Sequence, residues 1–81
     1  MTRLELRNLQ EAEIRSYLVE EFGGRADGDY VRGDGWAVRL VRGEPARLGR
    51  MRIPVLFLEV SGPREAETSN FLRRKTMRGG G

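Results

Sequence analysis

The stretch from Met51 to Val60, MRIPVLFLEV, decides how the rest of the chain can fold. Apolar residues recur in it at a spacing of two, which places Leu56, Leu58 and Val60 on one face of a strand. Phe57 is also apolar and falls on the opposite face. A strand that is apolar on both faces is typical of an interior position, so we expect this one to be central and covered on most of both faces.

The N-terminal residues predict a first strand followed by a helix. Leu4 and Leu6 alternate with charged residues, which indicates a strand with one buried face. Asn8 is a favourable N-cap, and Glu11 three positions later would complete a capping box. Glu11 and Arg15 are spaced to form an ion pair on the outer face of the helix.

That helix has an apolar stripe for the core. Ile14, Leu18 and Phe22 recur every fourth residue, with Tyr17 beside them. The pair Gly23-Gly24 predicts the end of the helix, because glycine tolerates a positive φ.

The middle of the chain predicts short strands and tight turns. A short segment from Arg25 to Arg32 leads to Asp34-Gly35, a pair that favours a hairpin turn. The residues that follow alternate from Trp36 to Leu40 as in a strand. Pro45 restricts the next segment to an edge or irregular position, because proline cannot donate to a strand ladder, and a further turn is expected around Gly49.

The C-terminal segment predicts a second helix. Pro63 suits the first position of a helix, with acidic residues near its start and basic residues near its end. Its expected apolar side is narrow and comprises Ala66, Phe71, Leu72 and Met77. The whole pattern indicates one α+β domain over residues 1–78, with an antiparallel sheet, two helices on one face, and a flexible glycine tail at 79–81.

The expected core follows from these elements. We predict mostly buried side chains at Leu6, Ile14, Leu18, Phe22, Trp36, Val38, Leu56, Leu58 and Phe71.

Composition limits the chemistry of the chain. Its 81 residues contain no cysteine and no histidine, the residues that supply most nucleophiles, general bases and transition-metal ligands. The sequence therefore predicts a protein that is not an enzyme and has no cofactor or metal. No signal peptide or membrane span is apparent, so we expect a cytoplasmic protein. The scarcity of Asn and Gln resembles the composition of thermophile proteins.

Several motifs are better explained by structure than by binding. Asp27, Asp29 and Asp34 invite a calcium site, but Val31 and Arg32 interrupt the ligand pattern and polar turns explain the aspartates. No Gly-Lys-Ser/Thr follows the glycines, so no phosphate loop is predicted.

Two further candidates have similar explanations. The adjacent Glu20 and Glu21 point in different directions on a helix and suit a solvated surface. Trp36 alternates with apolar residues and is interpreted as core, with ligand stacking as the alternative.

Two C-terminal features remain as candidate functional sites. The first is a basic stretch that could contact phosphates, composed of Arg73, Arg74, Lys75 and Arg78. The alternative is a solvated helix end, since the net charge of +3 is small for a nucleic-acid protein. The second is the terminal run Gly79, Gly80 and Gly81. An unhindered glycine end can enter a narrow adenylating active site, and a frayed terminus is the alternative.

The chain as a whole resembles the C-terminal domain of MoaD-related proteins, a domain of unknown function that follows a ubiquitin-like sulfur-carrier domain. The segments that carry the resemblance are Tyr17 to Gly24, Gly35 to Arg39, Glu44-Pro45 with Gly49, Ile53-Pro54 with Glu59-Val60, and Arg78 to Gly81. The resemblance implies a TBP-like β-α-β(4)-α fold and a loose link to sulfur transfer or molybdenum-cofactor assembly. It supplies no catalytic residues, and the sequence corresponds to the extra domain without the carrier domain.

Three functional hypotheses follow. The first is a non-catalytic interaction module that binds a protein partner of a sulfur-carrier or molybdenum-cofactor pathway, through the sheet face or the basic C-terminal helix. The second is a carrier or modifier whose Gly81 is adenylated and converted to a thiocarboxylate. The third is weak nucleic-acid binding through the basic stretch.

Overall fold

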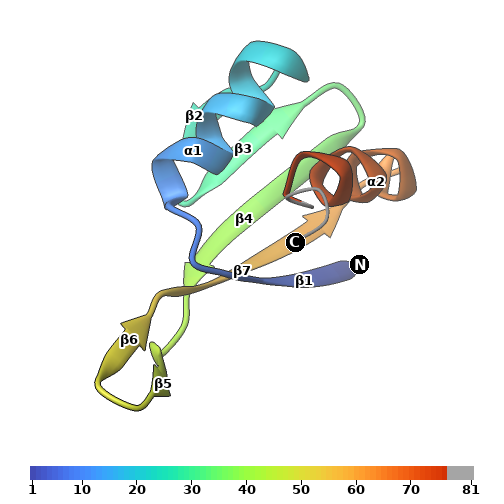
Figure 1. Ribbon diagram of the computed structural model, residues 1–81. Helices are drawn as coiled ribbons and strands as arrows, with labels where there is room; N and C mark the ends of the chain where they lie inside the picture. The colour runs from blue at the N-terminus through green and yellow to red at the C-terminus, as the bar shows by residue number, and fades with distance from the viewer. Residues whose placement is uncertain (77–81) are drawn as a thin grey trace.

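The chain folds as β-α-β(4)-α with one inserted hairpin, and the computed structural model describes residues 1–76 (Figure 1). The elements in order are β1 (Thr2–Arg7), α1 (Glu11–Ser16), the π-helical turn η1 (Tyr17–Glu21), β2 (Arg25–Asp27), β3 (Tyr30–Gly33), β4 (Trp36–Arg42), β5 (Ala46–Leu48), β6 (Met51–Ile53), β7 (Val55–Ser61) and α2 (Glu65–Thr76). The predicted α+β class and element order are confirmed.

Five strands form one antiparallel sheet in the order β1-β7-β4-β3-β2, and β5 and β6 form a separate two-stranded sheet. Strand β7 therefore has a neighbour on each side, as its apolar sequence predicts. Leu58 pairs with Leu4 of β1 and with Leu40 of β4, so all three side chains lie on the same face.

Both helices pack on the face that carries Leu58. Ile14 of α1 and Leu72 of α2 belong to the same buried cluster as Leu58. Of the predicted core, seven residues are buried, while Leu6 and Phe22 are half-buried and pack against the cluster.

The opposite face of the sheet is not covered by either helix. On it, Phe57 is half-buried beneath the guanidinium of Arg3, which lies 4.3 Å from the ring centroid. Arg39 and Glu59 form an ion pair nearby at 3.6 Å. The second face of β7 is thus less covered than its sequence predicts.

The strand predicted from Met51 to Val60 is interrupted at Pro54, which corrects the expected boundaries. Proline has no N–H to donate, so the ladder cannot continue through it. Residues 51–53 instead pair with 46–48, as an edge hairpin that projects from the body of the molecule (Figure 1). The edge position predicted after Pro45 is confirmed.

The start of the first helix also differs from the prediction. Asn8 adopts a φ of 62° and its N–H donates to the carbonyl of Pro54 at 2.9 Å, so it belongs to a turn after β1. The residue that caps the helix is Gln10, whose carbonyl accepts the N–H groups of Glu13 and Ile14. The predicted capping box is therefore wrong, because Asn8 is held by the end of the sheet.

The second half of this helix is a π-helical turn rather than a regular continuation. The apolar stripe survives, because Leu18 is fully buried and Phe22 packs against two aromatic rings. The Phe22 ring lies 5.2 Å from Trp36 and 4.5 Å from Phe71, centroid to centroid. Gly23, with a φ of 74°, ends the helix as predicted.

Helix α2 begins at Glu65, two residues after the predicted start, and its buried face is rotated from the predicted one. Phe71 and Leu72 are buried as expected, but Ala66 is exposed and Thr68 and Ser69 are buried. The buried Thr68 hydroxyl donates a hydrogen bond to the carbonyl of Arg64 at 2.8 Å. Met77, the other predicted apolar residue, lies outside the described residues.

Within residues 1–76, neither helix has the length and apolar character needed to cross a lipid bilayer.

Replacing Leu58 by alanine should reduce the free energy of unfolding by about 2 to 5 kcal/mol, because the side chain is fully buried between β1, β4 and both helices. Urea unfolding followed by circular dichroism measures the change. Val19→Ala is the control, because Val19 is 38% exposed and should cost much less. Equal losses in the two variants would contradict the observed register.

Candidate interaction surfaces

The predicted basic stretch lies at the end of α2, and an ion pair neutralises part of its charge. Lys75 forms an ion pair with Glu21 of η1 and lies 5.7 Å from the Tyr17 ring centroid. Arg73 and Arg74 are exposed and form no ion pair with any described carboxylate.

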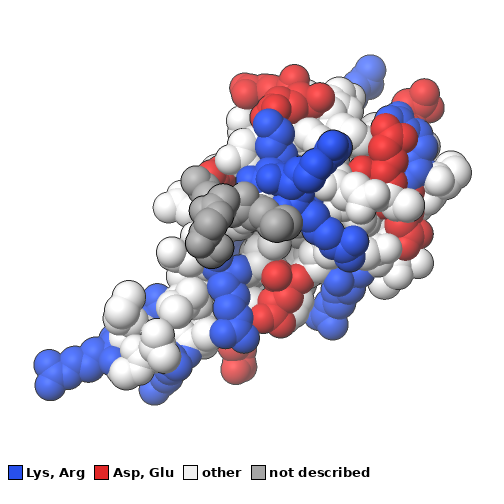
Figure 2. Space-filling view, turned by 45° about the vertical axis from the view of Figure 1, so that its right-hand side comes forward, with Lys and Arg blue, Asp and Glu red and all other residues white. Residues whose placement is uncertain are grey.

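The remaining predicted site residues, Arg78, Gly79, Gly80 and Gly81, lie outside the described residues. Figure 2 shows acidic and basic side chains interspersed on the face that it displays. Nucleic-acid binding through the α2 stretch therefore stays a prediction that rests on two unpaired arginines.

The aspartates of the predicted turns are not gathered into one site. Asp27 pairs with Arg32 at 3.1 Å, across the β2–β3 turn. Among residues 1–76, no three acidic side chains come close enough together to hold a metal ion. Trp36 is 4% exposed and belongs to the core, which confirms the interpretation of its alternating neighbours.

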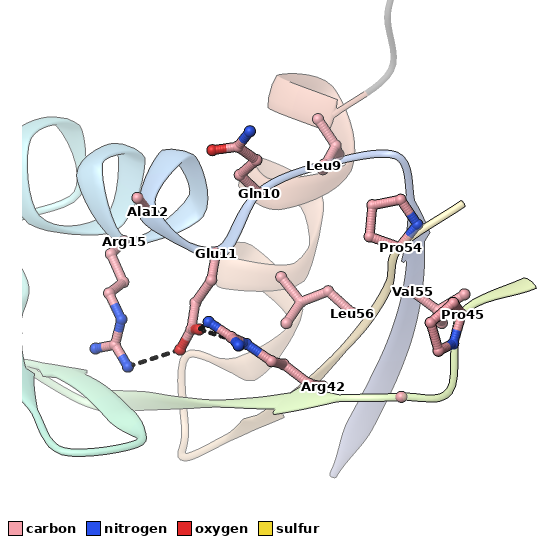
Figure 3. A pocket seen from close by; sticks show the side chains of 11 residues that line it. Leu9, Gln10, Glu11, Ala12, Arg15, Arg42, Pro45, Pro54, Val55 and Leu56 are labelled. Atoms are coloured by element: carbon pink, nitrogen blue, oxygen red, sulfur yellow. Dashed lines mark hydrogen bonds and ion pairs between the residues drawn. The ribbon is translucent and has the colours of Figure 1, made fainter. Parts of the chain in front are cut away.

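A groove of about 550 Å³ opens where α1 begins and the β5–β6 hairpin leaves the sheet (Figure 3). Its apolar walls come from three parts of the chain that are distant in sequence. They comprise Leu9 from the turn before α1 and Ala12 from α1, Pro45 from the loop between β4 and β5, Pro54 between β6 and β7, and Val55 and Leu56 from the start of β7.

One carboxylate joins two arginines at the rim of this groove. The Glu11 side chain accepts a hydrogen bond from Arg15 at 3.0 Å and another from Arg42 of β4 at 3.2 Å (Figure 3). Arg15 also donates to the carbonyl of Gly28, in the β2–β3 turn. The helix, the strand and the turn are thereby linked at the rim of the groove.

The same contacts set the ionisation of Glu11. Its hydrogen bond from Arg15, followed by that from Arg42, holds the pKa of Glu11 below its ordinary value of 4.5. Desolvation acts in the opposite direction and does not outweigh them. Glu11 is therefore a fixed anion near neutral pH.

The β5–β6 hairpin is the second surface feature near this groove, and we refer to residues 46–53 as the arm. Leu48 and Met51 face each other across its two strands and are 66% and 63% exposed. Arg47 and Arg52 form the adjacent cross-strand pair. At the hairpin end, lower left in Figure 2, the projecting side chains are basic or uncharged.

The chain matches, over residues 2–81, the family model described as archaeal MoaD-like protein. It belongs to the archaeal MoaD-like family. The match spans nearly the whole chain, so membership applies to the entire fold and confirms the MoaD-related resemblance. No curated protein matches the chain.

Membership in the archaeal MoaD-like family links this fold to proteins of sulfur carriage and molybdenum-cofactor assembly.

The sequence predicts the contact between Glu11 and Arg15, but it does not predict the groove beside these two residues. Arg42 lies 31 residues from Glu11, so no local spacing reveals their ion pair. The arm has a local signal, because apolar residues alternate with arginines between Pro45 and Pro54. That alternation, bounded by two residues that cannot donate to a ladder, is enough to indicate a separate hairpin.

Glu11→Gln should lower the free energy of unfolding by about 1 kcal/mol at neutral pH, because it removes the charge that holds Arg15 and Arg42. The folded pKa of Glu11 lies below the unfolded one, so its stabilising contribution is complete above the unfolded value and disappears as the pH falls through the folded pKa. The parent and the variant should therefore converge in acid.

Urea unfolding at about pH 7 and about pH 3 tests this pH dependence. Glu44→Gln is the matched control, since Glu44 is exposed and forms no ion pair among residues 1–76. A difference between the parent and Glu11→Gln that persists unchanged in acid would contradict the assignment.

Proposed function

We propose that this protein is a non-catalytic interaction module that binds a protein partner in sulfur-carrier or molybdenum-cofactor pathways. The observation that carries the proposal is the groove at the base of the arm. It combines apolar walls with a charged rim, which is the usual composition of a protein-binding patch. Family membership supplies the link to sulfur carriage.

The groove is suited to receiving side chains of a partner without rearrangement. Its rim is held by the ion pairs of Glu11, at 3.0 Å to Arg15 and 3.1 Å to Arg42. Pro45 and Pro54 stiffen the opposite wall, because the proline ring fixes φ. A preorganised groove loses less conformational entropy when a partner binds, which favours affinity.

The ionisation of Glu11 supports binding rather than proton transfer. A general acid or base works best when its pKa lies near the operating pH. Two guanidinium groups instead depress the pKa of Glu11, so its proton affinity is low at neutral pH. The arrangement is better suited to orienting Arg42, whose side chain is 81% exposed, toward a partner.

A second candidate is a carrier whose terminal glycine is activated. Family membership among MoaD-like proteins favours it, together with the three glycines at the end of the chain. In that mechanism the Gly81 carboxylate attacks the α-phosphorus of a nucleoside triphosphate and pyrophosphate leaves. Hydrosulfide then attacks the acyl carbon and displaces the nucleoside monophosphate to give a thiocarboxylate. The chemistry belongs to the activating enzyme, and this chain would supply only an accessible end.

The two candidates predict different results when the protein is purified gently from its native host. The interaction module predicts an unmodified intact mass and a stoichiometric partner. The partner should be lost from Ala12→Trp, which fills the groove, and kept by Ala66→Trp, which places the same side chain on the exposed face of α2. Native mass spectrometry measures the intact mass of the protein and the stoichiometry of its partner in one experiment.

The carrier instead predicts an intact mass in which sulfur replaces one oxygen, or a ladder of larger conjugates. The absence of any stoichiometric partner would contradict the interaction module. Equal retention by Ala12→Trp and Ala66→Trp would show that the partner does not use the groove.

A further inference from the structure

The arm is amphipathic across its two strands. In an antiparallel pair, residues that face each other share a face, and the side chains alternate along each strand. The register pairs Ala46 with Ile53 and Leu48 with Met51, so these four apolar side chains share one face. Arg47 and Arg52 lie together on the other face.

Among residues 1–76, the apolar face is covered only where the arm joins the body. Ala46 and Ile53, at the base, are half-buried, whereas Leu48 and Met51, near the tip, are mostly exposed. Covering large exposed apolar side chains with another apolar surface lowers the free energy of the system. Leu48 and Met51 therefore form an exposed apolar surface at the tip of the arm.

The basic face is equally unpartnered. Arg47 and Arg52 face each other as a like-charged pair, an arrangement that destabilises a hairpin in isolation. Neither they nor Arg50 in the turn form an ion pair with a carboxylate in residues 1–76. An anionic group placed on this face would remove the repulsion.

We propose that the arm binds an extended segment of the partner protein in which acidic and apolar residues alternate. The segment pairs with an open edge of the arm as a third strand. Its apolar side chains then extend the face of Leu48 and Met51, while its carboxylates reach Arg47 and Arg52. The inference rests on the proposed function and names the surface and the chemistry of its partner.

The charges of the arm also disfavour its pairing with the arm of a second copy of this chain. Two copies of this chain pairing edge to edge would bring four arginines together, so the arm disfavours self-association. Pairing along one edge of this eight-residue hairpin also supplies only part of the roughly 800 Å² per partner of a standard interface. The groove at the base of the arm supplies the additional contact that a stable complex needs.

The apolar face distinguishes a protein segment from other anionic partners. The phosphates of duplex DNA would satisfy the arginines but would offer little to Leu48 and Met51. An anionic lipid surface would cover both, but it would not provide backbone groups for the strand edge. Both become outcomes of the test.

The test uses the intact protein and a short synthetic peptide in which glutamate alternates with valine. Chemical-shift changes of backbone amides, measured by NMR during titration, report where the peptide binds. We expect shifts concentrated in residues 46–53 and in the groove. One control peptide contains the same residues with the glutamates contiguous. A second control has lysine in place of each glutamate. Neither should bind the arm.

Charge reversal provides the matched variants. Arg47→Glu combined with Arg52→Glu keeps a like-charged pair in the hairpin, so its effect on folding should be small, while peptide affinity should fall about tenfold or more. Arg73→Glu combined with Arg74→Glu makes the same change of charge on α2 and should leave the affinity within about twofold of the parent. Leu48→Ser should weaken binding without altering its salt dependence.

Three results would overturn the proposal: no shift in the arm, equal binding of the contiguous-glutamate peptide, or tighter arginine-dependent binding to duplex DNA or to phosphatidylserine vesicles. A natural partner that co-purifies equally with the Arg47→Glu, Arg52→Glu variant would also overturn it, while leaving the proposed function intact. The peptide titration does not use the natural partner, so its failure and the absence of any co-purifying protein are separate results.

Discussion

The pairing of β7 with β1 and β4 stops at Pro54, and two hydrogen bonds fix the position of that stop. The N–H of Asn8 donates to the carbonyl of Pro54 at 2.9 Å, and the N–H of Gly43 donates to the carbonyl of Val55 at 3.0 Å. The proline nitrogen has no hydrogen to continue the ladder. Three strands are thereby tied at one point, and the residues between Gly43 and Pro54 must leave the sheet as a hairpin (Figure 1).

The groove and the arm both follow from this junction. Anchoring Asn8 places Leu9 and the start of α1 on one side of the groove, and Pro45 and Pro54, which flank the hairpin, lie on the other. Glu11 then closes the rim through Arg42, at the last position of β4. The core stabilises the body, whereas Leu48 and Met51 are exposed on the arm, where they add nothing to the core and remain available for a partner.

How much of this the sequence predicts depends on how local the determining contacts are. The alternation around Leu58 and the stripe through Ile14 predict the sheet, the first helix and most of the core, because burial imposes those periods directly. The capping box at Asn8 fails because a distant carbonyl competes for that residue. The groove needs Glu11 and Arg42 together, a contact set by the sheet register, so local spacing cannot reveal it.

Amide hydrogen exchange, measured by NMR on the free protein, tests most directly whether the junction at Pro54 separates a stable body from a locally unstable arm. We expect the amides of Asn8 and Gly43 to be protected together with those of Leu56–Val60, while the amides of Arg47 and Arg52 exchange far faster. Exchange at Asn8 and Gly43 as fast as in the arm would contradict it, because the strands would then not be tied at that point.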